Sequence, residues 1–217
     1  MTRVSILNNI DEIFSELSKF YKDQLCAVDK YKDPYKVLIS CIISLRTKDE
    51  VTEKSSEKLF AKASTPFEMI KLTPEKISNI IFPAGFYKRK GKQIWDISNI
   101  LIDKFNGNVP DNVNELLKLK GVGRKTANLV LSAGFNIPAI CVDTHVHRIS
   151  NRIGLVSSTT PEGTETQLMD ILDKKYWLTI NNLMVLHGKN ICTPISPKCS
   201  KCVISSFCAK NNVEKSR

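Results

Sequence analysis

Four cysteines stand within seventeen residues near the end of the chain, in the spacing C-x6-C-x2-C-x5-C: Cys192, Cys199, Cys202 and Cys208. Four thiolates so close together suit a tetrahedral zinc ion or a cubane iron–sulfur cluster. Zinc sites more often use two C-x2-C pairs, and this run has only one. The spacing predicts a metal centre and leaves both kinds open. The remaining cysteines lie in apolar surroundings typical of buried thiols: Cys26, Cys41 and Cys141.

A second stretch that could do chemistry is LKLKGVGRKTANLVLSAG, in which two glycines and a basic pair separate two apolar runs. Gly121 and Gly123 permit positive φ and leave their backbone N–H groups unobstructed. A helix that begins at Arg124 would add free N–H groups and the positive end of its dipole. Phosphate fits such a place and is bound there without reading base sequence. The alternative is an ordinary turn, and the flanking apolar residues favour a hairpin of two packed helices.

Lys125 and Asp143 are the candidate reactive residues. Lys125 could simply bind phosphate, but Arg124 and the helix end disfavour further positive charge, and a neutral amine can attack a sugar carbon to form a Schiff base. Asp143 follows an apolar triplet and precedes a helical stripe, which predicts an N-cap. A carboxylate there could also stabilise oxocarbenium-like charge as a glycosidic bond breaks. The two roles of Asp143 are compatible.

Helices must position these residues, because helical periodicity dominates the chain. Apolar residues recur at i, i+3, i+4 and i+7 in 10–21 and 94–105, and 37–45 is apolar on nearly every side. We expect a central buried helix over 37–45. Asn112 with Glu115 predicts a capping box. Alternating strand patterns are nearly absent, so the sequence predicts an all-α fold of about ten helices.

Charge and apolar runs narrow the class of partner. Lys and Arg outnumber Asp and Glu by 32 to 22, a net charge of +10 that favours a polyanionic partner. A membrane surface would also attract this charge, but no basic amphipathic helix with bulky apolar anchors stands out. The longest apolar run is too short to span a bilayer, and no secretory signal is visible. We expect an intracellular protein in a reducing compartment.

The order of four blocks carries a family resemblance: LKGVGRKTAN, VDTHVHR, LHGK and the four-cysteine run. From about Tyr35 to Cys208 it resembles endonuclease III, of the helix-hairpin-helix DNA glycosylase superfamily. The resemblance makes Lys125 the Schiff-base lysine, Asp143 the catalytic aspartate and the four cysteines the ligands of a [4Fe–4S] cluster. It implies a bifunctional DNA glycosylase and AP lyase of base excision repair. The substrate would be double-stranded DNA with an abasic site or a flipped-out oxidised or saturated pyrimidine.

The resemblance also implies the arrangement of the chain. Residues 27–137 would form a six-helix lobe with the hairpin, and residues 1–26 with 138–217 a second helical lobe that carries the cluster. DNA would lie across the cleft, with the lysine on one wall and the aspartate on the other. We expect a monomer without membrane attachment, cytoplasmic and nucleoid-associated, of the prokaryotic type.

The expected DNA contacts are Arg46, Phe86, Gly121, Gly123 and Arg124. By the resemblance, Phe86 occupies the place of an apolar wedge, although a core aromatic is an equal alternative. Arg46 stands where bacterial relatives often have glutamine, at the position expected to fill the gap left by the flipped base. Lys120 replaces a proline of the usual hairpin, which adds charge near phosphate and keeps the clamp.

Two other functions compete with this one. A monofunctional mismatch glycosylase of the same superfamily generally lacks the hairpin lysine, so Lys125 speaks against it. A non-catalytic DNA-binding module with a structural metal would not need the pair of Lys125 and Asp143.

Overall fold

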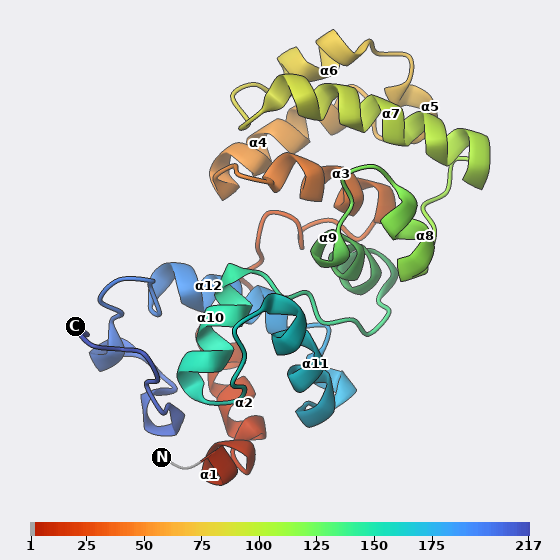
Figure 1. The fold of residues 1–217 in the computed structure, drawn as a ribbon. Helices are drawn as coiled ribbons and strands as arrows, with labels where there is room; N and C mark the ends of the chain where they lie inside the picture. Colours follow the sequence, from red (N-terminus) through yellow and green to blue (C-terminus); the bar gives the residue numbers. More distant parts are fainter. Residues whose placement is uncertain (1–2) are drawn as a thin grey trace. The chain divides into compact units, whose positions relative to one another are not determined.

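The computed structural model describes residues 3–217, and every regular element in that range is helical (Figure 1). The all-α prediction is confirmed. The first two residues of the predicted segment 1–26 lie outside the described range. Twelve α-helices occur there: α1 Arg3–Leu7, α2 Ile10–Phe20, α3 Pro34–Ser44, α4 Asp49–Phe60, α5 Pro66–Met69, α6 Pro74–Ile81, α7 Tyr87–Phe105, α8 Val113–Lys118, α9 Arg124–Leu129, α10 Thr144–Ile153, α11 Pro161–Ile171 and α12 Ile180–Asn190. The short elements are a π-helix, η1 Val130–Gly134, and three 3-10 turns, η2 Lys174–Tyr176, η3 Cys199–Lys201 and η4 Ser205–Phe207.

The chain divides into two compact units. One joins Met1–Leu25 to Ile140–Arg217, and the other is Cys26–Ala139. The six-helix lobe of residues 27–137 and the cleft expected beside it remain predictions.

The unit Cys26–Ala139 is built around α3, whose residues from Val37 to Ile43 are all buried. Asp33 caps this helix by accepting a 2.8 Å hydrogen bond from the Lys36 N–H, and Pro34 takes the first helical position. Helices α4, α7 and α9 and the π-helix η1 pack on it, while α6 lies along α7 (Figure 1). The predicted central helix is confirmed, except that it ends at Ser44 and leaves Leu45 exposed.

The other unit packs the apolar stripe of α2 against α10 and α12. Ile13, Phe14 and Leu17 of α2 are buried, as the periodicity of residues 10–21 predicts. From α10 and α12 come further buried members of this core: Val146, Ile149, Ile153 and Met184. Burying each such side chain contributes roughly 1.5–3 kcal/mol, which offsets the entropy of ordering the helices.

One local expectation needs correction. Asn112 caps α8 by accepting from the Glu115 N–H at 3.0 Å, but the Glu115 carboxylate accepts from Lys118 at 2.5 Å, so the reciprocal half of the predicted capping box is wrong. Helix α9 is followed directly by the π-helix η1, Val130–Gly134. In residues 3–217, no helix has both the length and the apolar character needed to cross a membrane.

Candidate functional site

The predicted hairpin joins α8 to α9. Its first glycine, Gly121, has φ +79, the left-handed region that favours glycine. The second, Gly123, has φ −98 and ψ 177, which is extended backbone that any residue adopts. Of the two glycines that permit positive φ, only Gly121 adopts it. A Cβ added at Gly123 would meet nothing within 4 Å, so the backbone there faces open space.

Helix α7 supports this hairpin through Gln93. The Gln93 Nε2 donates a 3.0 Å hydrogen bond to the carbonyl oxygen of Lys120, the residue that stands in place of proline. A Cβ at Gly121 would lie 2.4 Å from the same Nε2 atom. A side chain at Gly121 would thus strain the backbone and displace the group that braces the turn.

Lys125 is exposed on the second residue of α9, beside the exposed Arg124. Its ammonium lies near enough to the Cys41 thiol of α3 to favour the thiolate slightly. Burial is the stronger effect and raises the pKa of Cys41 to about 12. Cys41 is therefore a neutral buried thiol, as its apolar surroundings predict, and does not compete as a nucleophile.

Asp143 is the N-cap of α10, as predicted. One oxygen, Oδ1, accepts from the N–H groups of His145 and Val146, both at 2.9 Å. These bonds hold the half-buried carboxylate at the start of α10. Asp143 belongs to the unit with the chain ends and Lys125 to the other unit. Their joint action remains a prediction.

Arg46 and Phe86 are brought together by two unusual turns. Both residues have left-handed backbone, with φ +52 for Arg46 and φ +57 for Phe86. The Arg46 guanidinium carbon lies 5.6 Å from the centre of the Phe86 ring. Phe86 is 59% exposed, so the core-aromatic alternative is wrong. Both residues line one depression with Gly121 of the hairpin.

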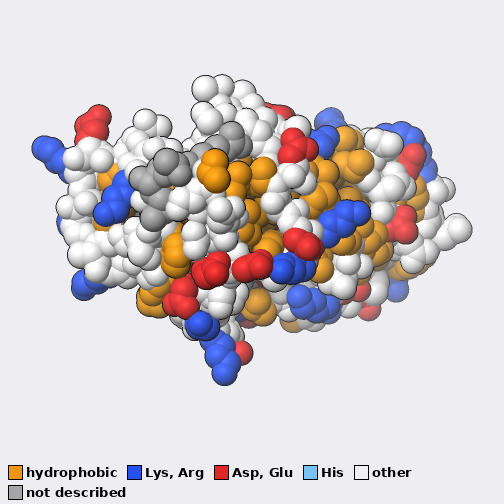
Figure 2. All heavy atoms as spheres, turned by 90° about the horizontal axis from the view of Figure 1, so that it is seen from below, with side chains coloured by type: hydrophobic (Ala, Val, Ile, Leu, Met, Phe, Trp, Pro, Cys, Tyr) orange, Lys and Arg blue, Asp and Glu red, His pale blue; other side chains and the backbone are white. Residues whose placement is uncertain are grey.

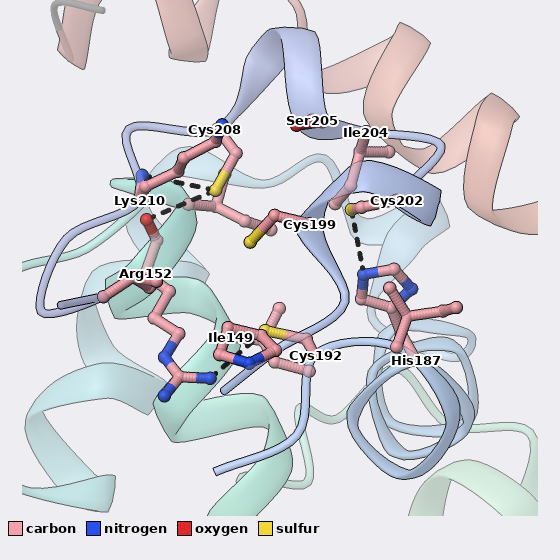
Figure 3. A pocket seen from close by; sticks show the side chains of 14 residues that line it. Ile149, Arg152, His187, Cys192, Cys199, Cys202, Ile204, Ser205, Cys208 and Lys210 are labelled. Atoms are coloured by element: carbon pink, nitrogen blue, oxygen red, sulfur yellow. Dashed lines mark hydrogen bonds between the residues drawn. The ribbon is translucent and has the colours of Figure 1, made fainter. Parts of the chain in front are cut away.

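The four C-terminal cysteines line one pocket with apolar walls. Figure 3 shows their side chains standing around a common space. In the described range, no three His, Cys, Asp or Glu side chains are gathered closely enough to hold a single metal ion. Burial, with smaller effects of the neighbouring thiolates, raises the pKa of Cys202 to about 11 and that of Cys208, so ionised sulfurs here require a cationic centre.

Three N–H donors surround these sulfurs (Figure 3). Arg152 Nη1 donates to Cys192 at 3.5 Å, and the Lys210 backbone N–H to Cys208 at 3.3 Å. His187 lies 3.4 Å from Cys202 through Nε2. Such donors stabilise thiolates that bind a cluster, so this ligand set fits an iron–sulfur group.

The proton of His187 can be assigned from its other neighbour, Tyr21. Burial lowers the pKa of His187 to about 4 and raises that of Tyr21, so the imidazole is neutral and the phenol protonated. The Tyr21 hydroxyl, 3.2 Å away, then donates to Nδ1 and leaves the Nε2 proton for Cys202. The sequence interpretation missed both Arg152 and His187 in these roles. The signal for His187 was its place in the block LHGK.

The Lys and Arg side chains are not concentrated in one patch on the face drawn in Figure 2. Figure 2 shows a face on which Lys and Arg side chains are interspersed with Asp and Glu.

Two family models and a bacterial relative match this chain. A family model described as the HhH-GPD superfamily of base excision DNA repair proteins matches residues 39–174. A second, described as the iron-sulfur binding domain of endonuclease III, matches residues 192–208, from the first to the last of the four cysteines. Endonuclease III of Thermotoga maritima is 48% identical over 199 residues, which cover 92% of this chain and 92% of that protein.

Solved structures give the same result. One of them is a trapped covalent intermediate of endonuclease III with DNA, whose protein chain is 34% identical in sequence to this one and superposes with a TM-score of 0.85. The match covers 97% of each chain. A thermostable thymine-DNA glycosylase is 25% identical with a TM-score of 0.81, over 94% of this chain and 97% of that one. The fold is that of helix-hairpin-helix DNA glycosylases, and the group carried by the C-terminal loop is a [4Fe–4S] cluster. The chain belongs to the endonuclease III family, within the superfamily of base excision DNA repair proteins.

Proposed function

We propose that this protein binds damaged duplex DNA, releases an oxidised or saturated pyrimidine and cleaves the strand by β-elimination, with Lys125 as nucleophile and Asp143 as the catalytic carboxylate. Membership of the endonuclease III family gives the activity, that of a DNA glycosylase and AP lyase. The observation that carries the proposal is the likeness, over 97% of the chain, to an endonuclease III trapped in a covalent intermediate with DNA. The residue assignments rest on the sequence motifs that hold Lys125 and Asp143.

The first step is an exchange of bonds at the sugar. The lone pair of the neutral Lys125 amine forms a bond to C1′, and the glycosidic bond breaks with its electrons leaving on the base. The amine passes one proton to the ring oxygen O4′ and the C1′–O4′ bond breaks with its electrons on O4′, which gives an iminium between C1′ and Nζ. The departing base anion takes a proton from water. Exposure of Lys125 at the start of α9 lets it reach a nucleotide that has left the stack.

The second step uses the iminium as an electron sink. Loss of the C2′ proton becomes easier, and β-elimination then breaks the C3′–O bond and releases the 3′ phosphate. Water hydrolyses the remaining imine and restores Lys125. A glycosylase that uses water in place of lysine would leave the strand intact.

Asp143 would stabilise the positive charge that develops on the sugar as the base leaves. Its two hydrogen bonds from the N–H groups of α10 fix the direction of the carboxylate. A carboxylate so held needs little reorganisation during the reaction.

The proposed DNA contacts are of two kinds, those to the phosphate backbone and those to the gap left by the flipped nucleotide. Gly121, Gly123 and Arg124 would bind phosphate, which fixes the enzyme on the duplex without reading sequence. Arg46 and Phe86 would enter the space left by the flipped nucleotide, since both are exposed and neighbours.

Cys192, Cys199, Cys202 and Cys208 would hold the [4Fe–4S] cluster through their sulfurs. The cluster, when bound, ties four side chains of the C-terminal loop together and neutralises their thiolates. Base release and strand cleavage need only the chain's own residues and water.

We also infer that the protein acts as a monomer in the cytoplasm, associated with the nucleoid. No cysteine of the described range is in a disulfide, which suits a reducing compartment. The relative described above is bacterial. Analytical ultracentrifugation tests the monomer, and imaging of a fluorescent fusion tests the location.

The experiment follows one thymine glycol in an end-labelled duplex, with each reaction divided into two portions. Alkali cleaves every abasic strand, so the alkali-treated portion measures base release and the untreated portion measures strand cleavage. We expect the two amounts to be similar for the wild type. Lys125→Gln should lose both, while Lys118→Gln, an exposed lysine paired with Glu115 on α8, should keep both. Cleavage seen only after alkali would indicate the monofunctional glycosylase, and no cleavage with intact binding a non-catalytic module.

A further inference from the structure

Lys90 is a buried lysine in the first turn of α7, with only 4% of its surface exposed. Its ammonium donates to the carbonyl oxygens of Ile43 at 2.7 Å and Leu45 at 2.6 Å, and to Thr47 Oγ1 at 2.8 Å. An ammonium has three N–H bonds, and all three are used on one five-residue segment. No carboxylate is among these partners.

Burial of such a charge is costly, and it lowers the pKa of Lys90 to about 8. The segment that receives its hydrogen bonds is the end of α3 and the turn that follows. Two of the acceptors are carbonyls that have no partner within an ending helix, where a positive charge is favourable. Between the second and third acceptors lies Arg46, whose left-handed backbone is strained for a residue with a side chain. The Lys90 bonds therefore hold a strained turn.

The same lysine is connected to the Phe86 turn. Its backbone N–H donates to the Phe86 carbonyl at 3.0 Å. Thr47 Oγ1, the third acceptor of the ammonium, also accepts from the Gly85 N–H at 3.0 Å. The two turns touch, because a Cβ at Gly85 would lie 2.4 Å from the Arg46 carbonyl oxygen. Lys90 and Thr47 thus join the turn of Arg46 to the turn of Phe86.

We propose that Lys90 is a positioning residue that locks the Arg46 and Phe86 turns together, so that both side chains enter the DNA stack as one preformed unit. This inference rests on the proposed function, in which these two residues fill the gap behind the flipped nucleotide. Direct contact of Lys90 with DNA would require a free N–H bond and an exposed ammonium, and it has neither.

Preformation matters because Arg46 and Phe86 have left-handed backbone, and without the hydrogen bonds of Lys90 each turn could adopt a more stable conformation. A wedge residue must be held in the inserting geometry before the duplex opens, and a misplacement of about 1 Å can slow a reaction roughly 100-fold. Loss of Lys90 should therefore slow reactions that need insertion into a duplex. Reactions on single-stranded DNA, which has no opposite base to displace, should be spared.

The test compares Lys90→Met with Lys92→Met, which removes the same charge from an exposed position two residues further along α7. The first measurement is the single-turnover rate of base release from a duplex that contains thymine glycol. The second is borohydride trapping at an abasic site in a single strand. We expect Lys90→Met to release the base about tenfold more slowly, with trapping on the single strand within about twofold of wild type. Lys92→Met should match wild type in both.

A second variant keeps the lysine and breaks the connection. Thr47→Val removes the oxygen that joins Lys90 to Gly85, and it should slow base release from the duplex while sparing the single strand. It remains informative if Lys90→Met does not fold. The 2-aminopurine fluorescence beside the lesion should be lower with each variant than with wild type, since the variants open the stack less often.

Equal losses on duplex and single strand, for both variants, would show a general structural role and overturn the inference. An unchanged duplex rate in Lys90→Met or Thr47→Val would overturn it as well. Failure of the proposed function looks different, because the wild type itself would then form no trapped product on either DNA.

Discussion

Replacement of the two hairpin glycines by alanine separates folding from DNA binding. Gly121 has φ +79 and a crowded Cβ position, whereas Gly123 has extended backbone and open space around it. Gly121→Ala should therefore weaken the fold. Gly123→Ala should leave the fold intact and weaken binding, because its methyl group would stand where phosphate approaches the backbone N–H groups.

The expected sizes follow from the local structure. An alanine in the left-handed region costs roughly 1–2 kcal/mol. Displacement of Gln93 from the Lys120 carbonyl costs about 1 kcal/mol more, and the stiffer unfolded chain returns about 0.5–1 kcal/mol. Gly121→Ala should thus lower the free energy of unfolding by about 2 kcal/mol. At Gly123, the N-cap of α9, the gain from the stiffer unfolded chain is offset because alanine caps less well than glycine, so Gly123→Ala should change the free energy of unfolding by less than about 0.5 kcal/mol. It should reduce affinity for DNA about tenfold, or ~1.4 kcal/mol.

Urea denaturation of the cluster-loaded protein measures the first quantity, and fluorescence anisotropy with an undamaged duplex at one fixed salt concentration measures the second. Each variant is the control for the other. The reasoning is refuted if Gly123→Ala binds DNA as tightly as wild type, or if it lowers the free energy of unfolding as much as Gly121→Ala does.

Three further predictions concern the other sites. Cys202→Ser should lower the iron content from about four atoms per chain, measured colorimetrically under low oxygen, and full retention would contradict the ligand assignment. Asp143→Asn keeps an oxygen for the cap, so the free energy of unfolding should change by less than about 1 kcal/mol while base release slows at least about 100-fold; an equal loss of stability and rate would mean that Asp143 is only a cap. Burial lowers the pKa of Lys90 in the folded state to about 8. Between this pKa and the higher pKa of the same lysine in the unfolded chain, the folded state binds fewer protons than the unfolded state. The free energy of unfolding of wild type, relative to that of Lys90→Met, should therefore rise by about 2–3 kcal/mol from pH 7 to pH 10. Urea denaturation at the two pH values measures this difference, and a constant difference would contradict the prediction.

Local patterns predicted the elements that depend on local physics. The run 37–45 is apolar on nearly every side, and a helix of that kind can only be buried, as α3 is. Asp143 before a helical stripe predicted its cap, because a short carboxylate there reaches the free N–H groups. The spacing of the four cysteines likewise predicted one metal centre.

The features that sequence reasoning missed depend on distant contacts. Gly121 adopts positive φ and Gly123 does not, and the sequence could not distinguish them because glycine permits that conformation without requiring it. His187 meets Tyr21 across 166 residues, which no local pattern shows. Lys90 lies on the apolar stripe of α7 with Ile94 and Ile97, so a signal existed, but a lysine in a stripe is usually exposed at its charged end.

The central claim is that the Lys125 amine attacks C1′ of the damaged nucleotide, and reductive trapping followed by mass spectrometry of the adduct tests it most directly. Borohydride reduces the iminium, so wild-type protein should become covalently attached to DNA that contains thymine glycol. After digestion with nuclease and trypsin, the added mass of the sugar should map to Lys125. Lys125→Gln should bind the duplex and yield no adduct. An adduct that maps to another lysine, or that Lys125→Gln forms at the wild-type rate, would contradict the account.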